Sequence, residues 1–412
     1  MKTRLLSALA AIGVTACVAY AANIPLITGP QDPSQLNATI NTLINSINTL
    51  ITPQSMSTFR DNRNFIDNGG MDIQQRGTGA ATCATTSGIV ATSYAADRWA
   101  CDVNVGSGAG QLTVITATPS PPTGFNASLK LNRNSGALTQ QQCAWQELRT
   151  QDVVKLQGQP VILSFYAQAL AGLAADNGNA ITAVIITGTG TDQGLGGLRS
   201  AVGMTASPAI TPAWTGIATL QAQAQTITTS WVRYTMPSVV VATTVNEMAV
   251  GLCFTPTATG AGATDGFAFT GVQLEQGTTA SPFEFRNTSV EALVAQRYYW
   301  QITEPAASVS IGASGQGAST TTCILSIPLP TQMDIVPTAG FTGTALSGST
   351  WTVTHVVTNT ALSTPFLAAT AGGSTKNALN LTATTGATLT AGQTCTLTGA
   401  GGGGILTASA DF

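Results

Sequence analysis

Apolar and polar residues alternate along much of this chain, most regularly in residues 161–169. Successive side chains of a β-strand point to opposite faces of a sheet, so the alternation predicts strands with one buried face. Similar patterns recur in residues 181–186, 231–236, 246–254 and 267–274, separated by loops rich in Gly, Asn, Thr and Pro. This order predicts an antiparallel β-sandwich or jelly roll and argues against Rossmann-type and TIM-barrel folds. In the first segment the side predicted to be buried consists of Val161, Leu163, Phe165, Ala167 and Ala169.

The low content of charged residues excludes several classes of protein. Only 8% of the 412 residues are charged, whereas 43% are hydrophobic, so the chain is not a disordered polyelectrolyte. Fifteen Lys and Arg residues against 18 Asp and Glu residues leave a net charge of −3. A nucleic-acid-binding protein needs a basic face, so no nucleic-acid partner is expected.

The first 22 residues have the order of charged and apolar residues found in a secretory signal peptide. Lys2 and Arg4 precede an apolar stretch at 5–16, and Ala-Tyr-Ala follows at 19–21, with small residues at its first and third positions. Residues 14–17 (Val-Thr-Ala-Cys) also resemble a lipobox, in which the cysteine would be acylated. An uncleaved apolar peptide that docks into a larger particle is the alternative. Residues 1–22 are therefore predicted to be a signal-like peptide that is cleaved, lipidated or retained.

Residues 23–59 are predicted to form an attachment segment around one helix. Asp32 and Pro33 are typical of a helix start, and Pro53 ends the pattern. Apolar residues then recur at spacings of four and three, as in the seam of a short coiled coil. Ile at one core position and Leu at the other favours two strands, but Ile44 and Ile51 widen the apolar face toward three or more. A homotrimer is thus expected, with a single helix docked on its own domain as the alternative. The seam residues are Leu36, Ile40, Leu43, Ile47 and Leu50.

Seven cysteines occur without a C-x-x-C pair, which argues against zinc and thioredoxin-type sites. Cys253 and Cys395 lie in alternating segments, where a thiol can pack as an apolar side chain. If Cys17 is removed or acylated, six cysteines remain, and three disulfides are possible in an oxidising compartment. The spacing selects no pairing.

Five blocks of sequence between residues 60 and 300 are informative when they are taken together and in their order along the chain. They are residues 64–77 (Asn-Phe-Ile-Asp-Asn-Gly-Gly-Met-Asp-Ile-Gln-Gln-Arg-Gly), 94–99 (Tyr-Ala-Ala-Asp-Arg-Trp), 271–277 (Gly-Val-Gln-Leu-Glu-Gln-Gly), 281–286 (Ser-Pro-Phe-Glu-Phe-Arg) and 296–300 (Gln-Arg-Tyr-Tyr-Trp). Together they resemble the jelly-roll, carbohydrate-binding-module-like domain of bacteriophage and prophage tail fibres. The last blocks resemble that family's final strand and exit helix.

The resemblance implies a fold and a function. The chain is expected to be mainly β, with a jelly-roll sandwich and closing helix over residues 60–300 and a second small β-domain, the outer tip, over residues 301–412. The expected function is a virion fibre or spike protein that binds a host-surface glycan without cleaving it. Its expected partners are further copies of itself and other virion proteins, contacted through the N-terminus. An exported, surface-anchored bacterial carbohydrate-binding protein or lipoprotein is the alternative.

Within the blocks, Arg76, Asp97 and Arg98 are among few charges in an apolar context. Buried charges persist when they are paired and hydrogen-bonded, so we interpret these three as structural anchors rather than as a catalytic set. Residues 288–291 (Thr-Ser-Val-Glu) match a capping box. A helical stripe should follow it, made of Val290, Leu293, Val294, Arg297 and Tyr298.

Tryptophans are the candidate sugar contacts, since a flat apolar ring with a polar edge suits a pyranose. Trp99 and Trp231 lie in strand-like patterns, so we expect them in a core. Trp145 and Trp214 lie in less regular stretches and are the better ligand-binding candidates.

Beyond residue 300 charge almost disappears, which marks a domain boundary. Alternation at 350–357, 380–383 and 394–398 predicts a further all-β unit. Its Thr-, Ser- and Gly-rich loops suit hydrogen bonding to a glycan, and as the outer domain it is expected to carry most of the receptor contact. The charged residues of this region are Glu304, Asp334, Lys376 and Asp411.

The residues needed for catalysis are scarce. His355 is the only histidine and shares a face with apolar residues, so a packed imidazole is expected rather than a catalytic base. A glycosidase needs two facing carboxylates, for which Asp67 with Asp72, or Asp97 with Asp102, are the candidates. No nucleotide, zinc-protease or hydrolase motif occurs, and no calcium loop is visible. The sequence therefore predicts a binding protein without enzymatic activity, cofactor or metal.

Overall fold

The structure of the protein is a computed structural model. It describes residues 63–410 except 78, 84–93, 104–109, 134–138, 195–213, 258–264, 304–309, 343–350, 356–359, 363–365, 370–372, 385–390 and 400–403. The signal-like peptide, the attachment segment and its predicted seam at residues 36–50 lie outside the described residues. All described residues belong to one compact unit, residues 60–412.

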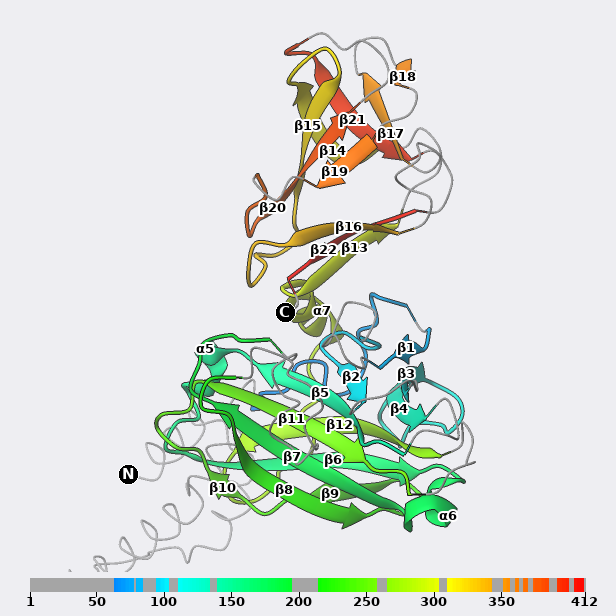
Figure 1. Cartoon of the computed structure of the whole chain (residues 1–412), viewed down its shortest axis with the longest axis vertical. Coiled ribbons are helices and arrows are strands. Elements are labelled where there is room, and N and C mark those ends of the chain that lie inside the picture. Colours follow the sequence, from blue (N-terminus) through cyan, green and yellow to red (C-terminus); the bar gives the residue numbers. More distant parts are fainter. Residues whose placement is uncertain are drawn as a thin grey trace, which may run out of the picture. The chain divides into compact units, whose positions relative to one another are not determined.

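Two antiparallel sheets face each other to form a sandwich (Figure 1). The first sheet, sheet A, has the order β1-β3-β4-β12-β6-β10, with β9 also paired to β6. Its strands are β1 (Ala81–Thr82), β3 (Gly110–Ile115), β4 (Ser128–Arg133), β6 (Pro160–Ala169), β9 (Val232–Thr235), β10 (Val239–Val240) and β12 (Gly266–Gln276). The second, sheet B, has the order β2-β5-β11-β7-β8. Its strands are β2 (Ala100–Val103), β5 (Gln142–Leu148), β7 (Ala180–Gly188), β8 (Ala218–Thr226) and β11 (Glu247–Phe254).

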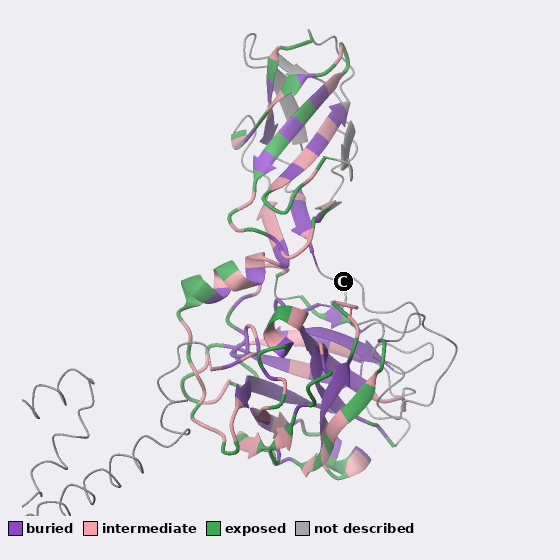
Figure 2. Ribbon diagram, turned by 90° about the vertical axis from the view of Figure 1, so that its left-hand side faces the viewer, coloured by how far each residue is buried: buried purple, intermediate pink, exposed green. Residues whose placement is uncertain are grey.

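The predicted period of two sets the core of the sandwich. Strand β6 turns the five residues predicted to be buried into the space between the sheets, where they meet Phe267 and Phe269 of β12. Trp99 is fully buried in the same core, as expected, and packs edge-on to Phe269 with ring centroids 5.4 Å apart. Most residues of the sandwich strands are buried (Figure 2). The mainly-β, antiparallel sandwich predicted from the sequence is confirmed.

Short helices connect and close the sandwich. These are α5 (Thr150–Val153), α6 (Leu173–Asn177) and α7 (Thr288–Gln296). The predicted capping box is corrected, because Asn287, and not Thr288, is the N-cap of α7, and its side chain accepts a hydrogen bond from the Ser289 N–H at 2.9 Å. No helix among the described residues is both long and apolar enough to span a membrane.

The buried stripe of α7 also differs from the prediction. Val290 and Leu293 are about half exposed, whereas Glu291, Ala295 and Tyr298 face inward. These three inward residues are spaced by four and then three positions, as on one face of a helix. Because Glu291 is charged, the pattern of apolar residues does not reveal this face.

The remaining strands form two further antiparallel sheets. One has the order β13-β22-β16, from β13 (Tyr299–Thr303), β16 (Thr338–Thr342) and β22 (Ile405–Ser409). The other has the order β18-β17-β21-β14-β15-β20-β19. Its strands are β14 (Ser310–Gly317), β15 (Thr322–Pro328), β17 (Trp351–His355), β18 (Thr360–Leu362), β19 (Phe366–Ala369), β20 (Ala378–Thr384) and β21 (Thr394–Gly399). Tyr299 and Trp300 already lie in β13, so the closing helix does not extend to residue 300.

Six cysteines form three disulfides. They are Cys83–Cys101, Cys143–Cys253 and Cys323–Cys395. The second joins residues that stand directly opposite each other on β5 and β11, and the third joins β15 to β21, the two strands that flank β14. These six cysteines therefore form disulfides, whereas Cys253 and Cys395 had been expected to pack as free thiols.

Candidate functional site

Arg76 and Asp97, two of the predicted structural anchors, contact residues that belong to other sequence blocks. The guanidinium of Arg76 lies between two rings, 4.5 Å from the centroid of Tyr94 and 3.7 Å from that of Tyr299, and burial lowers its pKa from the usual value. Asp97 accepts hydrogen bonds from the backbone N–H and the side-chain amide of Gln75, at 2.6 and 3.0 Å. Both residues thus connect blocks that are distant in sequence.

Arg98 is buried and has three kinds of partner. Its Nη2 donates to the carbonyl oxygen of Glu147 at 2.7 Å, and its Nε lies 3.5 Å from a carboxylate oxygen of Asp67. Its guanidinium carbon lies 3.6 Å from the ring centroid of Tyr298. These contacts are consistent with the structural role predicted for Arg98.

Two blocks that are about 200 residues apart in sequence meet at the edge of β12. The Asn64 side chain donates to the carbonyl oxygen of Val272 at 3.0 Å, and the Val272 N–H donates to the carbonyl oxygen of Gly69 at the same distance. Carboxylate oxygens of Glu284 accept hydrogen bonds from the backbone N–H groups of Arg63 and Asn64, at 3.1 and 2.8 Å. Segment 63–72 is therefore fixed against segment 281–291.

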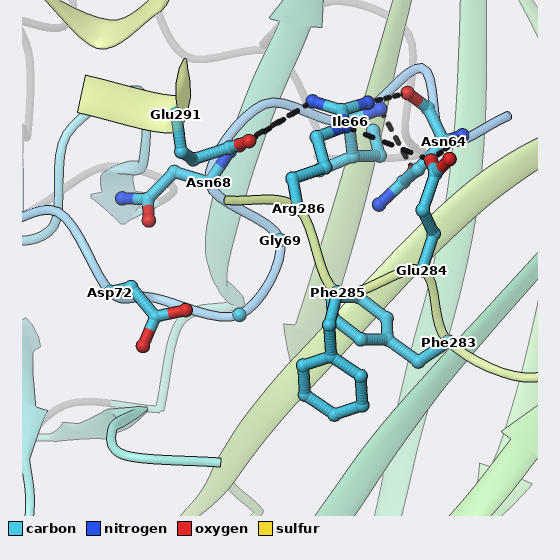
Figure 3. Close-up of a pocket in the computed structure, with 11 residues that line it drawn as sticks. Asn64, Ile66, Asn68, Gly69, Asp72, Phe283, Glu284, Phe285, Arg286 and Glu291 are labelled. Atoms are coloured by element: carbon cyan, nitrogen blue, oxygen red, sulfur yellow. Dashed lines mark hydrogen bonds and ion pairs between the residues drawn. The ribbon is translucent and has the colours of Figure 1, made fainter. Parts of the chain in front are cut away.

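Arg286 holds the junction of these segments together (Figure 3). Its guanidinium donates to the Asn64 carbonyl oxygen and lies 3.3 Å from a carboxylate oxygen of Glu291. The Glu291 carboxylate also accepts from the Asn68 N–H, and burial raises the pKa of Glu291 above its usual value. Asp67 lies 3.9 Å from the same guanidinium, and burial likewise raises its pKa.

Beside this junction lies a hollow lined by both segments. Its space measures about 290 Å³ when the open solvent at its mouth is counted, so it is a shallow surface hollow and not an enclosed cavity. Phe283 and Phe285 lie side by side in it, and Asp72 extends from the opposite segment (Figure 3). The two phenylalanines alternate with Glu284, so a strand-like backbone places both rings on one side and the carboxylate on the other.

Four rings form one cluster here, which we call the aromatic platform: Phe125, Tyr166, Phe283 and Phe285. Phe125 lies at its centre, with ring centroids 5.0 Å from those of Phe283 and Phe285 and 5.4 Å from that of Tyr166. Phe285 is 59% exposed, which is unusual for a ring already packed against two others.

Gly271 of β12 makes room for the platform. Its φ is +59°, and a Cβ atom at this position would lie 2.6 Å from Phe125 and 2.9 Å from Tyr166. The position falls within the irregular pairing between Thr270 and Gln273, where β12 shifts its register against β6. A bulge that only glycine tolerates thus brings two rings together on the outer face of sheet A.

Polar groups border the exposed ring. The Asn126 side chain donates to a carboxylate oxygen of Asp72 at 3.2 Å, and both side chains are exposed. Among the residues that the structure describes, no cation pairs with Asp72. The site therefore combines an apolar ring face with a carboxylate acceptor and an amide.

The predicted tryptophan contacts lie elsewhere and are buried. Trp145 is fully buried and donates from Nε1 to Asp102 at 2.8 Å. Trp214 is 3% exposed and donates from Nε1 to the Gly194 carbonyl oxygen at 3.0 Å. Both belong to a small apolar cluster on the outer face of sheet B, so neither offers a ring face to a sugar in this structure. Trp231, expected in a core, is only partly buried and donates to the Ser120 carbonyl oxygen at 2.6 Å.

The residues considered for catalysis have separate partners. Asp67 is paired with arginines while Asp72 is exposed beside Asn126, and Asp97 and Asp102 bond to Gln75 and Trp145. His355 lies in β17. Within the described ranges, no group of three or more His, Cys, Asp or Glu side chains gathers as a metal site would require.

The aromatic platform was not predicted from the sequence. Phe283 and Phe285 belong to the block at residues 281–286, and their Phe-Glu-Phe alternation after Pro282 is a usable signal for two rings on one face. Phe125 gives no such signal, because it reaches the platform only through the fold.

Comparison with known proteins gives structural likenesses only. No protein-family model matches the sequence, and no curated protein sequence matches it. Among solved structures, the enzymatically active domain of tailspike protein 4 of bacteriophage CBA120 is similar over 52% of this chain and 21% of that chain, with 11% identity and a TM-score of 0.28. A family 61 carbohydrate-binding module in complex with β-1,4-galactotriose is similar over 53% and 100%, with 10% identity and a TM-score of 0.27. A xylan-binding domain of family 22 is similar over 45% and 90%, with 13% identity and a TM-score of 0.26.

Proposed function

We propose that this protein binds a cell-surface glycan through the aromatic platform and does not cleave it. The observation that carries the proposal is the exposed ring of Phe285, held by Phe283 and Phe125 beside the carboxylate of Asp72. A fixed ring presents its face at a low cost in conformational entropy, and the C–H face of a pyranose can cover it. Hydroxyl groups at the edge of the sugar can then donate to Asp72.

The charge at the site favours a neutral glycan. No cation among the described residues pairs with Asp72, so the carboxylate of a uronic or sialic acid would be repelled there. The nearest guanidinium in the hollow, that of Arg286, is occupied by Glu291 and by the Asn64 carbonyl oxygen. A neutral sugar with adjacent hydroxyl groups satisfies Asp72 without this repulsion.

The test measures retention of the full-length protein on a panel of immobilised neutral and acidic polysaccharides. We expect retention on at least one neutral polysaccharide and no release of shorter chains. Phe285→Ala should weaken that binding about tenfold or more, which corresponds to about 1.4 kcal/mol. Val240→Ala is the matched control, because Val240, in β10, is equally exposed, at 60%, and is not part of the platform.

Three results would contradict the proposal. Wild-type protein could fail to bind any polysaccharide of the panel, Phe285→Ala could bind as well as Val240→Ala, or oligosaccharides could be released reproducibly. Unfolding curves of both variants must match that of the wild type, since Phe285 also packs against two rings.

We further propose that the binding serves attachment of a virion fibre or spike to its host. The sequence blocks that resemble phage tail fibres support this role, and three disulfides suit a protein that acts outside the cell. Residues 33–51 would associate as a trimer, the N-terminus would contact other virion proteins, and residues 301–412 would form the tip. Light scattering should show a multimer that Ile40→Asp with Ile47→Asp weakens.

The signal-like N-terminus favours the second candidate function, an exported bacterial carbohydrate-binding surface protein or lipoprotein. Mass spectrometry of the mature N-terminus separates the two candidates. An acylated Cys17 would support the lipoprotein and contradict the virion fibre.

A further inference from the structure

Strand β8 is a long strand at the edge of sheet B. It pairs with β7 on one side, and no strand of the described chain pairs with its other side. An edge strand presents unpaired N–H and C=O groups that can bind another strand, and proteins normally protect such edges by shortness, charge or proline. The other edge strands of the sandwich are short, with two residues each in β1 and β10 and four each in β2 and β9. By contrast, β8 has nine residues and contains neither a charge nor a proline.

The sequence of β8 complements itself. Residues 221–225 are Gln-Ala-Gln-Ala-Gln, which has the same order in both directions. Two copies paired antiparallel about a two-fold axis at Gln223 would therefore place Gln opposite Gln and Ala opposite Ala throughout. The pairing of β8 with β7 is regular from residue 221 to residue 226, so this stretch is a straight template.

The two faces of β8 suit such a contact. Ala222 and Ala224 are exposed on one face, where small side chains allow a second strand to approach. Gln221, Gln223 and Gln225 lie on the other face. The Gln221 amide donates to the Pro237 carbonyl oxygen at 2.8 Å and the Gln223 amide to the Ala224 carbonyl oxygen at 3.2 Å, and on pairing such amides can turn to donate and accept across the strands. The absence of charge within β8 means that no like charges would oppose one another.

We propose that β8 pairs antiparallel with β8 of a second copy of this chain, with Gln223 opposite Gln223. The contact joins sheet B of both copies into one continuous sheet and is isologous, since the same surface serves both partners. An extended peptide from another protein would occupy the same edge by strand addition, but it would not reproduce the symmetry about Gln223.

The symmetry allows a sharp cross-linking test on the full-length protein. Opposed residues of antiparallel strands have Cα atoms about 4.5–5.5 Å apart, within the range for a disulfide. Gln223→Cys should therefore form a covalent dimer under mild oxidation. Gln221→Cys is the matched control: its own copy would lie four residues along the strand, about 13 Å away, so it should stay monomeric on a non-reducing gel. Wild-type protein measures the background of dimers linked through Cys17, because the other six cysteines form disulfides within the chain.

A second test uses charge on the exposed face. Ala222→Lys with Ala224→Lys would place like charges opposite each other, whereas Ala222→Lys with Ala224→Glu would place opposite charges together in the same register. The first pair should lose association in sedimentation experiments, and the second should retain it. Both comparisons are made in the same chain, so association through residues 33–51 affects them equally.

Equal cross-linking at positions 221 and 223, or none at 223, would overturn the proposal. So would equal association of the two charge variants while both unfold at the wild-type temperature. Cross-linking of Gln223→Cys to another protein rather than to itself would assign the edge to a different partner and would also reject the self-pairing.

Discussion

Glu147 is a carboxylic acid buried between two arginines. Its side chain is 6% exposed, with Arg149 Nη1 3.3 Å from its carboxylate and Arg98 bonded to its backbone carbonyl oxygen. Burial raises the pKa of Glu147 from 4.5 to about 7, although Arg98 and Arg149 act in the opposite direction. Burial also raises the pKa of Asp265, to about 6. Both shifts have the same sign, so they act together on stability.

We expect the protein to be more stable at mildly acidic pH than at pH 8. Between pH 4.5 and about 7 the folded state holds a proton on Glu147 that the unfolded state releases, so the free energy of unfolding falls as pH rises through this window. At 1.36 kcal/mol per pKa unit, the change from Glu147 is at most about 3 kcal/mol. Denaturant unfolding at pH 5 and pH 8 measures it.

Glu147→Gln keeps the shape of the side chain and cannot titrate. It should flatten the slope of stability above about pH 6, leaving the part contributed by Asp265 and by the other carboxyl groups whose pKa burial raises, such as Asp67 and Glu291. An unchanged slope in Glu147→Gln would show that the side chain does not hold this proton.

Gly251 of β11 stands directly opposite Trp145 of β5. A Cβ atom at Gly251 would lie 2.2 Å from the indole ring, so Gly251→Ala must displace a fully buried tryptophan. We expect a loss of about 1–3 kcal/mol in the free energy of unfolding. Gly79→Ala is the control, because no heavy atom lies within 4 Å of its Cβ position. Equal stability of the two variants would contradict the packing described for Trp145.

At the scale of elements, disulfides hold strands that are distant in sequence. Cys143–Cys253 joins residues 110 positions apart, Cys323–Cys395 residues 72 apart, and Cys83–Cys101 residues 18 apart. A cross-link that closes a longer loop removes more conformational entropy from the unfolded chain.

Replacing each pair by alanine should therefore destabilise the protein in the order of loop length. Loss of Cys143–Cys253 should cost about 1.5 kcal/mol more than loss of Cys83–Cys101 by the loop-entropy relation. Denaturant unfolding of the three double variants, each compared with wild type, measures the order. The reverse order would show that native-state packing around the sulfur atoms outweighs loop entropy.

At the scale of the molecule, Asp334 connects the sandwich to the strands that follow it. Its carboxylate lies 2.5 Å from Arg149 Nη2 and 3.2 Å from Arg297 Nη2, and its N–H donates to the Arg297 carbonyl oxygen at 2.8 Å. Arg149 belongs to the sandwich, whereas Asp334 lies between β15 and β16. One carboxylate thus neutralises two arginines at the junction.

Asp334→Ala should weaken this connection. The change removes a charge-assisted contact worth about 1.5–3 kcal/mol, while Arg149 keeps its contact with Glu147. We expect faster proteolysis near residues 297–303 and two separate thermal transitions in calorimetry. Asp152→Ala is the control, since Asp152 pairs with the exposed Lys155 on the surface and should change stability by less than about 1 kcal/mol. A single transition in both variants would argue against the coupling.

The sequence by itself determined several of the strands and, for residues 161–169, which face is buried. The alternation in residues 161–169 predicted the inward side of β6, and the same pattern located β7, β11 and β12. These properties are local, because a period of two depends only on neighbouring residues and on which side of the strand is covered. The predicted seam at residues 36–50 stays a prediction.

Only the tertiary structure decided which distant residues meet. Cysteine spacing selected no disulfide, whereas the register of β11 on β5 places Cys253 opposite Cys143. Likewise, Trp145 lies in a stretch without regular alternation and was predicted to contact a sugar, but the fold buries it completely. The aromatic platform joins Phe125 to Phe285 across 160 positions of sequence. Strand register, the bulge at Gly271 and the covering of a sheet face depend on long-range packing, which no local pattern encodes.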